Sequence, residues 1–246
     1  MPSLNTAIAA LLSLGLLVAT TPARAEVDPA THAPAAVGAD RTELAAWVVA
    51  RGDNHGLPFL IVDKRSAEVS VFDAEGRELS SSPALIGLAA GDDTVAGIGD
   101  RPLSKIAAHE RTTPAGRFRA RFGPAEGQDE TFWIDFSAAV SLHPVVTSNR
   151  AERRLERLAS PSPEDNRITY GCINVPQPFF DTVVRPTFAA DGGVAYVLPD
   201  SKPLAAVFPG LSTGAASPVS GPEPQLAGAA SAAEGAVHAA ATAAQP

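Results

Sequence analysis

Short apolar runs separated by turn-forming residues dominate the middle of the chain. Residues 58–64 (PFLIVDK) are a nearly continuous apolar run, which is typical of a buried strand, and EVSVF at 68–72 alternates apolar and polar side chains. The segment DAEGREL at 73–79 supplies a turn and the beginning of another strand. The pattern therefore predicts a β-meander in this region.

Further segments of the chain have the length and pattern of strands. They are residues 84–90, 116–123, 131–136, 139–146, 168–175 and 194–198. Residues 91–103 form a long glycine-bearing loop without the spacing of a dinucleotide-binding or phosphate-binding motif. Because strand patterns are many and short while helical patterns are few, we expect a mainly β fold with short helices (α+β), built as a single β-sandwich or barrel domain.

Helical patterns occur at three places. Residues 40–52 begin with Asp40 as a candidate N-cap, followed three residues later by Glu43. Residues 151–159 place Ala151, Leu155 and Leu158 on one face, which we expect to pack on the domain. Residues 176–188 carry a proline in the first turn, where proline is well tolerated.

The two ends of the chain differ in composition from its middle. Residues 7–19 are uncharged and apolar and lead to Ala23-Arg24-Ala25, which predicts a signal peptide over residues 1–25 and export to the periplasm or cell wall. The apolar run is too short for a typical membrane span, so no span is expected after cleavage. Residues 26–39 are a predicted linker and 203–246, rich in Ala, Pro, Ser and Gly, a predicted disordered tail. The folded domain is then 40–202.

Composition and charge exclude several classes of function. The chain of 246 residues is 45% hydrophobic and has 19 basic against 27 acidic residues, a net charge of -8 without a basic tract. A nucleic-acid partner is therefore not expected. A single cysteine excludes an intrachain disulfide framework, and no two histidines have metal-ligand spacing. We predict neither a metal nor a cofactor.

The single cysteine, Cys172, is the main candidate for chemistry. In an exported protein such a thiol is a buried apolar side chain, a partner in an intermolecular disulfide, or a nucleophile. The chain has no G-x-S-x-G nucleophile motif, and Gly171 before the cysteine permits tight backbone geometry. A nucleophilic thiolate needs a neighbouring imidazole or helix N-terminus, and the domain offers the imidazoles of His55, His109 and His143.

Three motifs, in this order, resemble the L,D-transpeptidase (YkuD-type) catalytic domain family. They are TPAGRF at 113–118, SLHPV at 141–145 and ITYGCINVP at 168–176. The resemblance covers roughly residues 58–199. It implies a β-rich fold and a cysteine acyltransferase that acts on peptidoglycan stem peptides.

The resemblance also implies roles for individual residues. Cys172 matches the family nucleophile and His143 the histidine that activates it. The amides of Gly171 and Cys172 would stabilise the oxyanion, and Asn174 matches a position where the family has Asn or Arg. These residues, together with Tyr170, are the candidate catalytic and substrate-binding residues around the thiol.

Two departures from the family pattern affect this interpretation. Tyr170 replaces the histidine of the usual Ser/Thr-His-Gly-Cys core, and a tyrosine hydroxyl donates a hydrogen bond but is not a base at neutral pH. If the family histidine only orients its neighbours, Tyr170 can replace it; if that histidine transfers protons, Tyr170 cannot take over this role. Cys172 also follows His143 by 29 residues, a longer separation than is usual, and the extra length lies in residues 150–167.

The first eight residues of the insert at 150–167 carry four arginines, Arg150, Arg153, Arg154 and Arg157. Because it joins the two catalytic candidates, we expect it to form a wall or lid of a substrate groove. Arg153 and Arg154 are the candidate contacts to a stem-peptide carboxylate, since arginine binds carboxylates through paired hydrogen bonds. The alternative is a solvated helix without a role in substrate binding.

The sequence leaves four functions open. The first is acyl transfer through a Cys172 thioester, in cell-wall remodelling or cross-linking. The second is hydrolysis on the same scaffold, with water resolving the thioester. The third is a catalytically silent wall-binding module, and the fourth is an exported structural protein with intermolecular disulfides.

Overall fold

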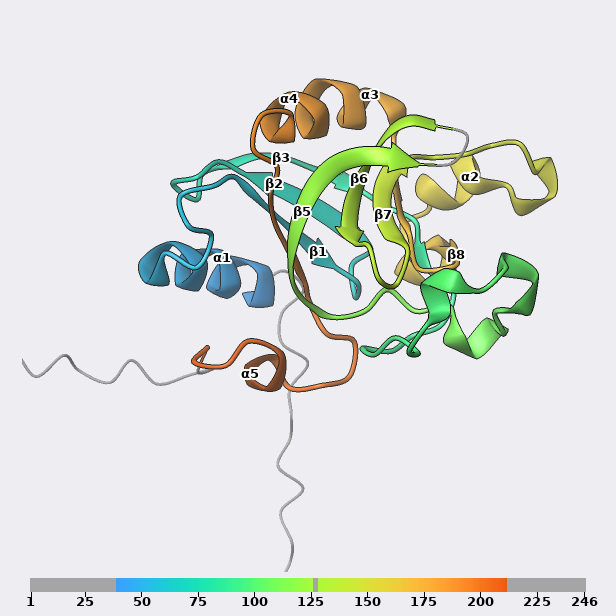
Figure 1. The fold of residues 1–246 in the computed structure, drawn as a ribbon, viewed down its shortest axis with the longest axis horizontal. Coiled ribbons are helices and arrows are strands. Elements are labelled where there is room, and N and C mark those ends of the chain that lie inside the picture. Colours follow the sequence, from blue (N-terminus) through green and yellow to red (C-terminus); the bar gives the residue numbers. More distant parts are fainter. Residues whose placement is uncertain (1–38, 126–127, 212–246) are drawn as a thin grey trace, which may run out of the picture.

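A computed structural model describes residues 39–125 and 128–211 (Figure 1). The predicted signal peptide (1–25), most of the linker and residues 212–246 of the predicted tail lie outside the described residues. Among the residues described, no helix is both long enough and apolar enough to cross a membrane.

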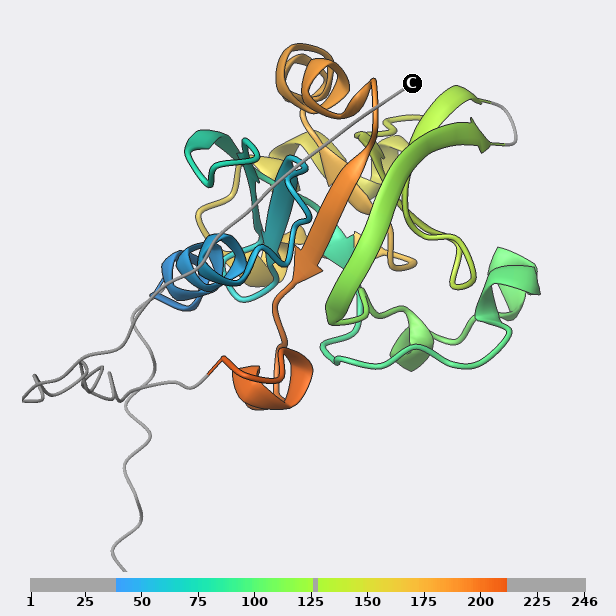
Figure 2. The same ribbon diagram turned by 60° about the vertical axis from the view of Figure 1, so that its left-hand side comes forward.

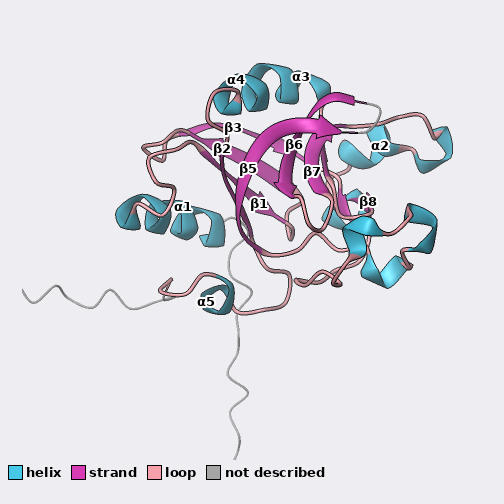
Figure 3. Cartoon of the chain, viewed as in Figure 1, coloured by secondary structure: helices cyan, strands magenta, loops and turns pink. Residues whose placement is uncertain are grey.

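Most strands of the described chain belong to one mixed sheet of eight strands, in the order β3-β2-β1-β10-β5-β6-β7-β9. Their bounds are β1 Phe59–Asp63, β2 Glu68–Phe72, β3 Glu78–Pro83, β5 Gly116–Ala125, β6 Gln128–Asp135, β7 Val140–Pro144, β9 Ile173–Val175 and β10 Gly193–Val197. Strands β4 (Ile86–Gly87) and β8 (Arg167–Thr169) pair separately. The helices are short apart from α1: α1 Ala39–Arg51, α2 Arg154–Leu158, α3 Gln177–Phe179, α4 Arg185–Phe188 and α5 Leu204–Val207 (Figure 3).

The sheet curls until its edge strand β9 meets the chain that follows β3. Leu85 and Asn174 exchange two backbone hydrogen bonds, each of 2.8 Å, and so close the gap between the two ends of the sheet. The long β5–β6 hairpin is itself strongly curved (Figure 2). The sheet is therefore nearly a barrel, with β7 and β9 at the point of closure.

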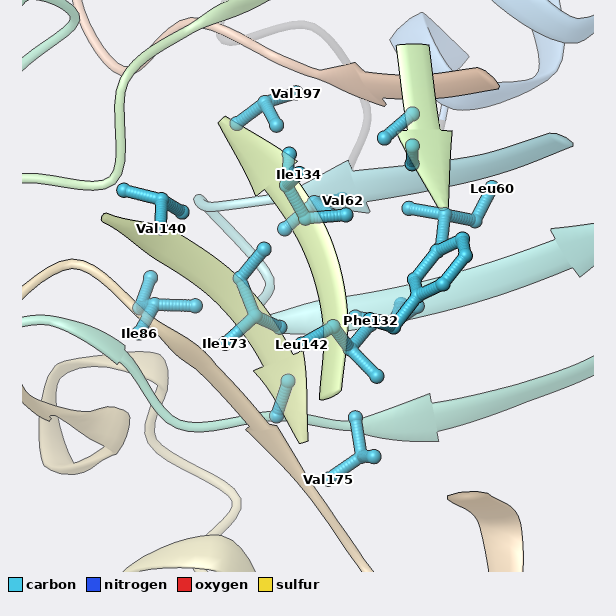
Figure 4. Close-up of a cluster of buried hydrophobic side chains, with 14 of the residues drawn as sticks. Leu60, Val62, Ile86, Phe132, Ile134, Val140, Leu142, Ile173, Val175 and Val197 are labelled. Carbon is cyan, nitrogen blue, oxygen red and sulfur yellow. The ribbon is translucent and has the colours of Figure 1, made fainter. Parts of the chain in front are cut away.

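Alternation along the strands divides the apolar residues between two cores. On β1, Leu60 and Val62 point into a cluster with Phe132 and Leu142 inside the curled sheet (Figure 4). Their neighbours Phe59 and Ile61 pack in a second cluster against α1 and α5. Every residue of β1 is buried, which explains why its sequence is a continuous apolar run.

The structure confirms the predicted fold class, a mainly β fold with a few short helices. Of the strand predicted at 84–90, only the two residues of β4 are in strand conformation. The predicted loop at 91–103 contains one 3₁₀ turn, Ile98–Asp100, and a second, Leu103–Lys105, begins at its last residue. The predicted helix at 176–188 is present, with a π-helical turn at Phe180–Val184 between α3 and α4.

The described residues include positions on both sides of the predicted domain of 40–202. Helix α1 begins at Ala39, so Asp40 lies in its first turn and is not an N-cap. The tail predicted to begin at residue 203 is folded as far as residue 211, because Leu204, Phe208 and Leu211 are buried in the second core. Their spacing of four and three residues is typical of an amphipathic helix, but α5 ends at Val207, and Phe208 and Leu211 follow it.

A buried ionic cluster ties the beginning of the domain to its end. The Lys64 side chain is fully buried, and its ammonium lies 3.0 Å from an Asp92 oxygen and 3.4 Å from an Asp200 oxygen. It also donates to the backbone carbonyls of Gly91 and Thr113. The cluster therefore fixes the loop before β5 against the chain that follows β10.

Asp92 makes the stability of this cluster depend on pH. Burial alone would raise the pKa of its carboxyl, but backbone amides of residues 200–202 and the Lys64 ammonium hold the pKa well below its ordinary value. The carboxylate then contributes stability fully above its unfolded pKa of about 3.9, and loses it as the pH falls through the lower folded value. The difference in unfolding free energy between wild type and Asp92→Asn, measured in urea, should be largest at neutral pH and shrink below about pH 4. A constant difference would contradict this.

Candidate active site

Strands β7 and β9 bring the sequence-predicted catalytic residues together. The two strands are parallel neighbours, with His143 paired to Asn174 and Leu142 to Ile173. Cys172 lies in the turn just before β9 and therefore faces the beginning of β7. Because side chains two residues apart share a face of a strand, Ser141 and His143 both point toward the thiol side, while Leu142 enters the core.

The Cys172 thiol is half-buried among polar groups. Its Sγ lies 3.6 Å from the Ser141 hydroxyl and 3.6 Å from the Ala139 carbonyl oxygen. Burial by itself would raise the thiol pKa, but hydrogen bonding and charge from His143, with hydrogen bonds from Ser141, outweigh burial and lower the pKa below its ordinary value. The surroundings thus favour a thiolate.

The His143 imidazole shows the complementary shift. Burial alone would lower its pKa, yet the hydrogen bond and the charge of Cys172 raise it above its ordinary value. Its Nδ1 lies 2.8 Å from the Pro144 carbonyl oxygen, to which it donates, and this bond also favours the charged ring. Thiol and imidazole therefore stabilise each other's charged form, as a nucleophile and its base require.

Asn174 and Arg154 lie on the other side of the imidazole. Asn174 is 1% exposed, and its Nδ2 is 3.0 Å from His143 Nε2. Its Oδ1 accepts a hydrogen bond of 2.8 Å from Arg154, whose Nε donates in turn to Glu152 at 2.5 Å. Two of the predicted substrate-binding residues are thus part of the hydrogen-bonded surroundings of His143.

Gly171 shapes the turn that carries the thiol. Its φ is +132°, and a Cβ at this position would lie 2.7 Å from the Thr112 carbonyl oxygen, so no other residue fits. Its amide donates to the Thr169 hydroxyl at 3.1 Å, while its carbonyl accepts from Thr113 at 2.9 Å. Since the amide has a partner within the turn, the observed role of Gly171 is conformational.

A cavity of about 70 Å³ opens beside the thiol. Tyr170 and Cys172 line one part of it, and apolar residues of 98–106, including Ile98 and Ile106, line another. The Arg111 guanidinium lies 4.0 Å from the centre of the Tyr170 ring, a cation–π contact. Tyr170 is therefore held as a wall of the cavity.

Arg153 and Arg157 of the insert make contacts within the insert itself. Arg153 pairs with Glu156 on the exposed surface, and Arg157 donates to the backbone carbonyls of Glu152 and Asp165. The predicted apolar face of this helix is wrong, because Leu158 is buried whereas Leu155 is 59% exposed. Helix α2 is only five residues long. Hydrogen bonds from Arg154 and Arg157, and not the apolar face that we expected, hold the insert in place.

Several residues of the site were missed in the sequence. Ser141 is two residues before His143 on a predicted strand, and this spacing alone places it on the same face. Thr113 was seen only as part of a motif, whereas its buried hydroxyl holds the turn of Gly171. The cavity residues at 98–106 gave no signal, because they come from a segment without periodicity. His55 and His109 are exposed.

The described residues contain no group of three or more His, Cys, Asp or Glu side chains arranged to hold a metal ion. The chemistry available at the site is that of a thiol, an imidazole and hydrogen-bond donors.

No family model and no curated protein matches this chain. Among solved structures it is similar to the helical cell shape determining protein Pgp2 from Campylobacter jejuni, at 13% identity over 65% of this chain, with a TM-score of 0.41; the chain spans 57% of Pgp2. An L,D-transpeptidase from Mycobacterium smegmatis matches at 15% identity over 57% of this chain and 58% of its own, with a TM-score of 0.32. The catalytic domain of an E. faecium L,D-transpeptidase matches at 15% identity over 58% of this chain and 98% of its own, with a TM-score of 0.30.

Proposed function

We propose that this chain is an exported cysteine acyltransferase that acts on peptidoglycan stem peptides through a thioester on Cys172. The observation that carries the proposal is the pair of Cys172 and His143, whose pKa shifts run in opposite directions beside an open cavity. A buried structural cysteine has no need of such a partner. The substrate class rests on the three motifs that resemble L,D-transpeptidases.

The geometry supports a two-step reaction. The Cys172 thiolate attacks an amide carbonyl of the donor stem, the carbon–nitrogen bond breaks, and the imidazolium of His143 gives its proton to the departing amine. The thioester is then attacked by an acceptor amine, whose proton passes to neutral His143 as the thiolate leaves. The amide of Cys172 is the proposed donor to the oxyanion of each tetrahedral intermediate.

The proposal is tested with the secreted full-length protein and a purified tetrapeptide-stem muropeptide, with and without an added amine acceptor. An acyltransferase releases the terminal residue and forms a new amide, which mass spectrometry detects. Release without the new amide shows a hydrolase. No turnover, and no mass adduct on Cys172 after incubation with a carbapenem, would contradict the proposal and leave the two alternatives without catalysis, a silent wall-binding module and a structural protein with intermolecular disulfides.

His143→Ala should slow alkylation of Cys172. Removing the imidazole takes away the largest influence that lowers the thiol pKa, while burial still raises it, so the thiolate fraction at neutral pH falls. We expect at least about a tenfold lower rate with iodoacetamide near pH 7, corresponding to a pKa increase of about one unit or more. His109→Ala, which changes an exposed histidine, is the matched control. Equal rates for all three proteins would reject the pairing.

A further inference from the structure

The Asn174 side chain is oriented by a partner that can only donate. An arginine guanidinium carries five N–H groups and no acceptor. Arg154 therefore fixes which end of the Asn174 amide it meets: the oxygen Oδ1, at 2.8 Å. The NH₂ group is then turned the other way, to His143 Nε2 at 3.0 Å. The Asn174 backbone is hydrogen-bonded to Leu85 and the residue is 1% exposed, so this orientation of its side-chain amide is fixed by its surroundings.

Arg154 is itself held in place. Its Nε donates to Glu152 Oε2 at 2.5 Å, and only 15% of its side chain is exposed. The guanidinium thus donates from Nε to Glu152 and from Nη1 to Asn174. These contacts leave Arg154 as part of the scaffold behind the imidazole.

We infer that Arg154 is a positioning residue, which acts through Asn174 to present an N–H group to His143 Nε2 and so favours the neutral imidazole with its proton on Nδ1. The ring proton of the neutral imidazole is then on Nδ1, where the Pro144 carbonyl accepts it. A proton on Nε2 would point at the N–H group of Asn174. The inference rests on the proposed function, because it concerns the base of that same reaction.

Cys172 and Arg154 act on the imidazole in opposite directions. Cys172 favours the charged ring, whereas the positive charge of Arg154 disfavours it. The hydrogen bond from Asn174 adds to the effect of Arg154, because it is made only to the neutral ring. Arg154 therefore offsets part of the influence of the thiolate and increases the population of neutral His143, the protonation state that the second step requires.

The test is the titration of His143 followed by NMR in the full-length protein with labelled histidine rings. The measurements are made in Cys172→Ser, which removes the coupled thiol, and the His143 signal is assigned by its loss in His143→Gln. Arg154→Met should raise the His143 pKa by about half a unit to one unit, the equivalent of one hydrogen bond made to the neutral form. Arg154→Lys, which keeps a donor and the charge, should restore part of the shift. Arg77→Met, which removes a charge from a side chain 80% exposed, should not change it.

A double-mutant comparison separates the effect that Arg154 has on the His143 pKa through Asn174 from the direct effect of its charge. In an Asn174→Ala background, Arg154→Met should change the His143 pKa far less than in the presence of Asn174. The same shift in both backgrounds, or no shift in either, would overturn the inference. Because the titration needs no substrate, its result is independent of whether the chain acts on peptidoglycan.

Discussion

Replacing Cys172 with serine should abolish turnover of stem peptides completely while leaving the fold intact. The hydroxyl has nearly the volume of the thiol, but its proton is far less acidic, so the imidazole of His143 cannot generate the nucleophile. We expect no thioester and no released residue over the time in which the wild type consumes its substrate. Mass spectrometry of the protein and of the products checks both.

The unfolding transition of Cys172→Ser is the control for this experiment. Its midpoint in urea should match that of the wild type, because the contacts of Sγ with Ser141 and Ala139 are long and polar. Full activity in this variant would overturn the thioester mechanism. If Cys172→Ser loses stability as well as activity, Cys172→Ala is measured in the same way, so that the effect on the reaction is separated from the effect on the fold.

Replacing Lys64 with methionine should be the most damaging single change for stability. The ammonium is fully buried with Asp92 and Asp200, and its removal leaves carboxylates in the interior with one cation fewer. Breaking a buried ion pair in this way typically costs about 3–5 kcal/mol, a large share of the stability of an ordinary domain. The midpoint and slope of urea unfolding, followed by circular dichroism, measure the loss.

Arg65→Met is the matched control, because Arg65 is the next residue along the chain but pairs with Asp40 on the surface, where such a bridge is worth about 1 kcal/mol or less. A loss for Lys64→Met no greater than that of the control would show that the buried cluster contributes little. In that case Lys64→Met/Asp92→Asn should be no more stable than Lys64→Met alone.

The elements of this fold could be predicted wherever one physical signal dominates. The buried run before Asp63, the alternation of EVSVF and the proline at the beginning of the 176–188 helix each led to an observed element. The prediction was wrong where tertiary contacts override the local pattern. Leu155 has helical spacing to Leu158, but nothing in the sequence says that the insert is held by its arginines, which leaves Leu155 in solvent.

The candidate site was predicted in part for the same reason. Cys172, His143 and Asn174 lie in short motifs, and the structure places them together. The role of Arg154 depends on the direction of one side-chain amide, and that direction follows only from the three-dimensional contact of residues 20 positions apart. The burial of Lys64 could not be predicted either, because Lys64 directly follows a strand, and a lysine at such a position is ordinarily solvated.

The last strand of the chain fills the middle of the sheet. Strand β10 lies between β1, to which it is parallel, and β5, so its neighbours come from the beginning and the centre of the domain. A nascent chain cannot complete the sheet until residue 197 is available, because the strands described before β10 form two separate parts of it, β3-β2-β1 and β5-β6-β7-β9. Such long-range pairing slows folding. The sheet should therefore be completed only after β10 has been made, and a truncation before Gly193 should remove the strand that joins the β1–β3 meander to the strands that carry Cys172 and His143.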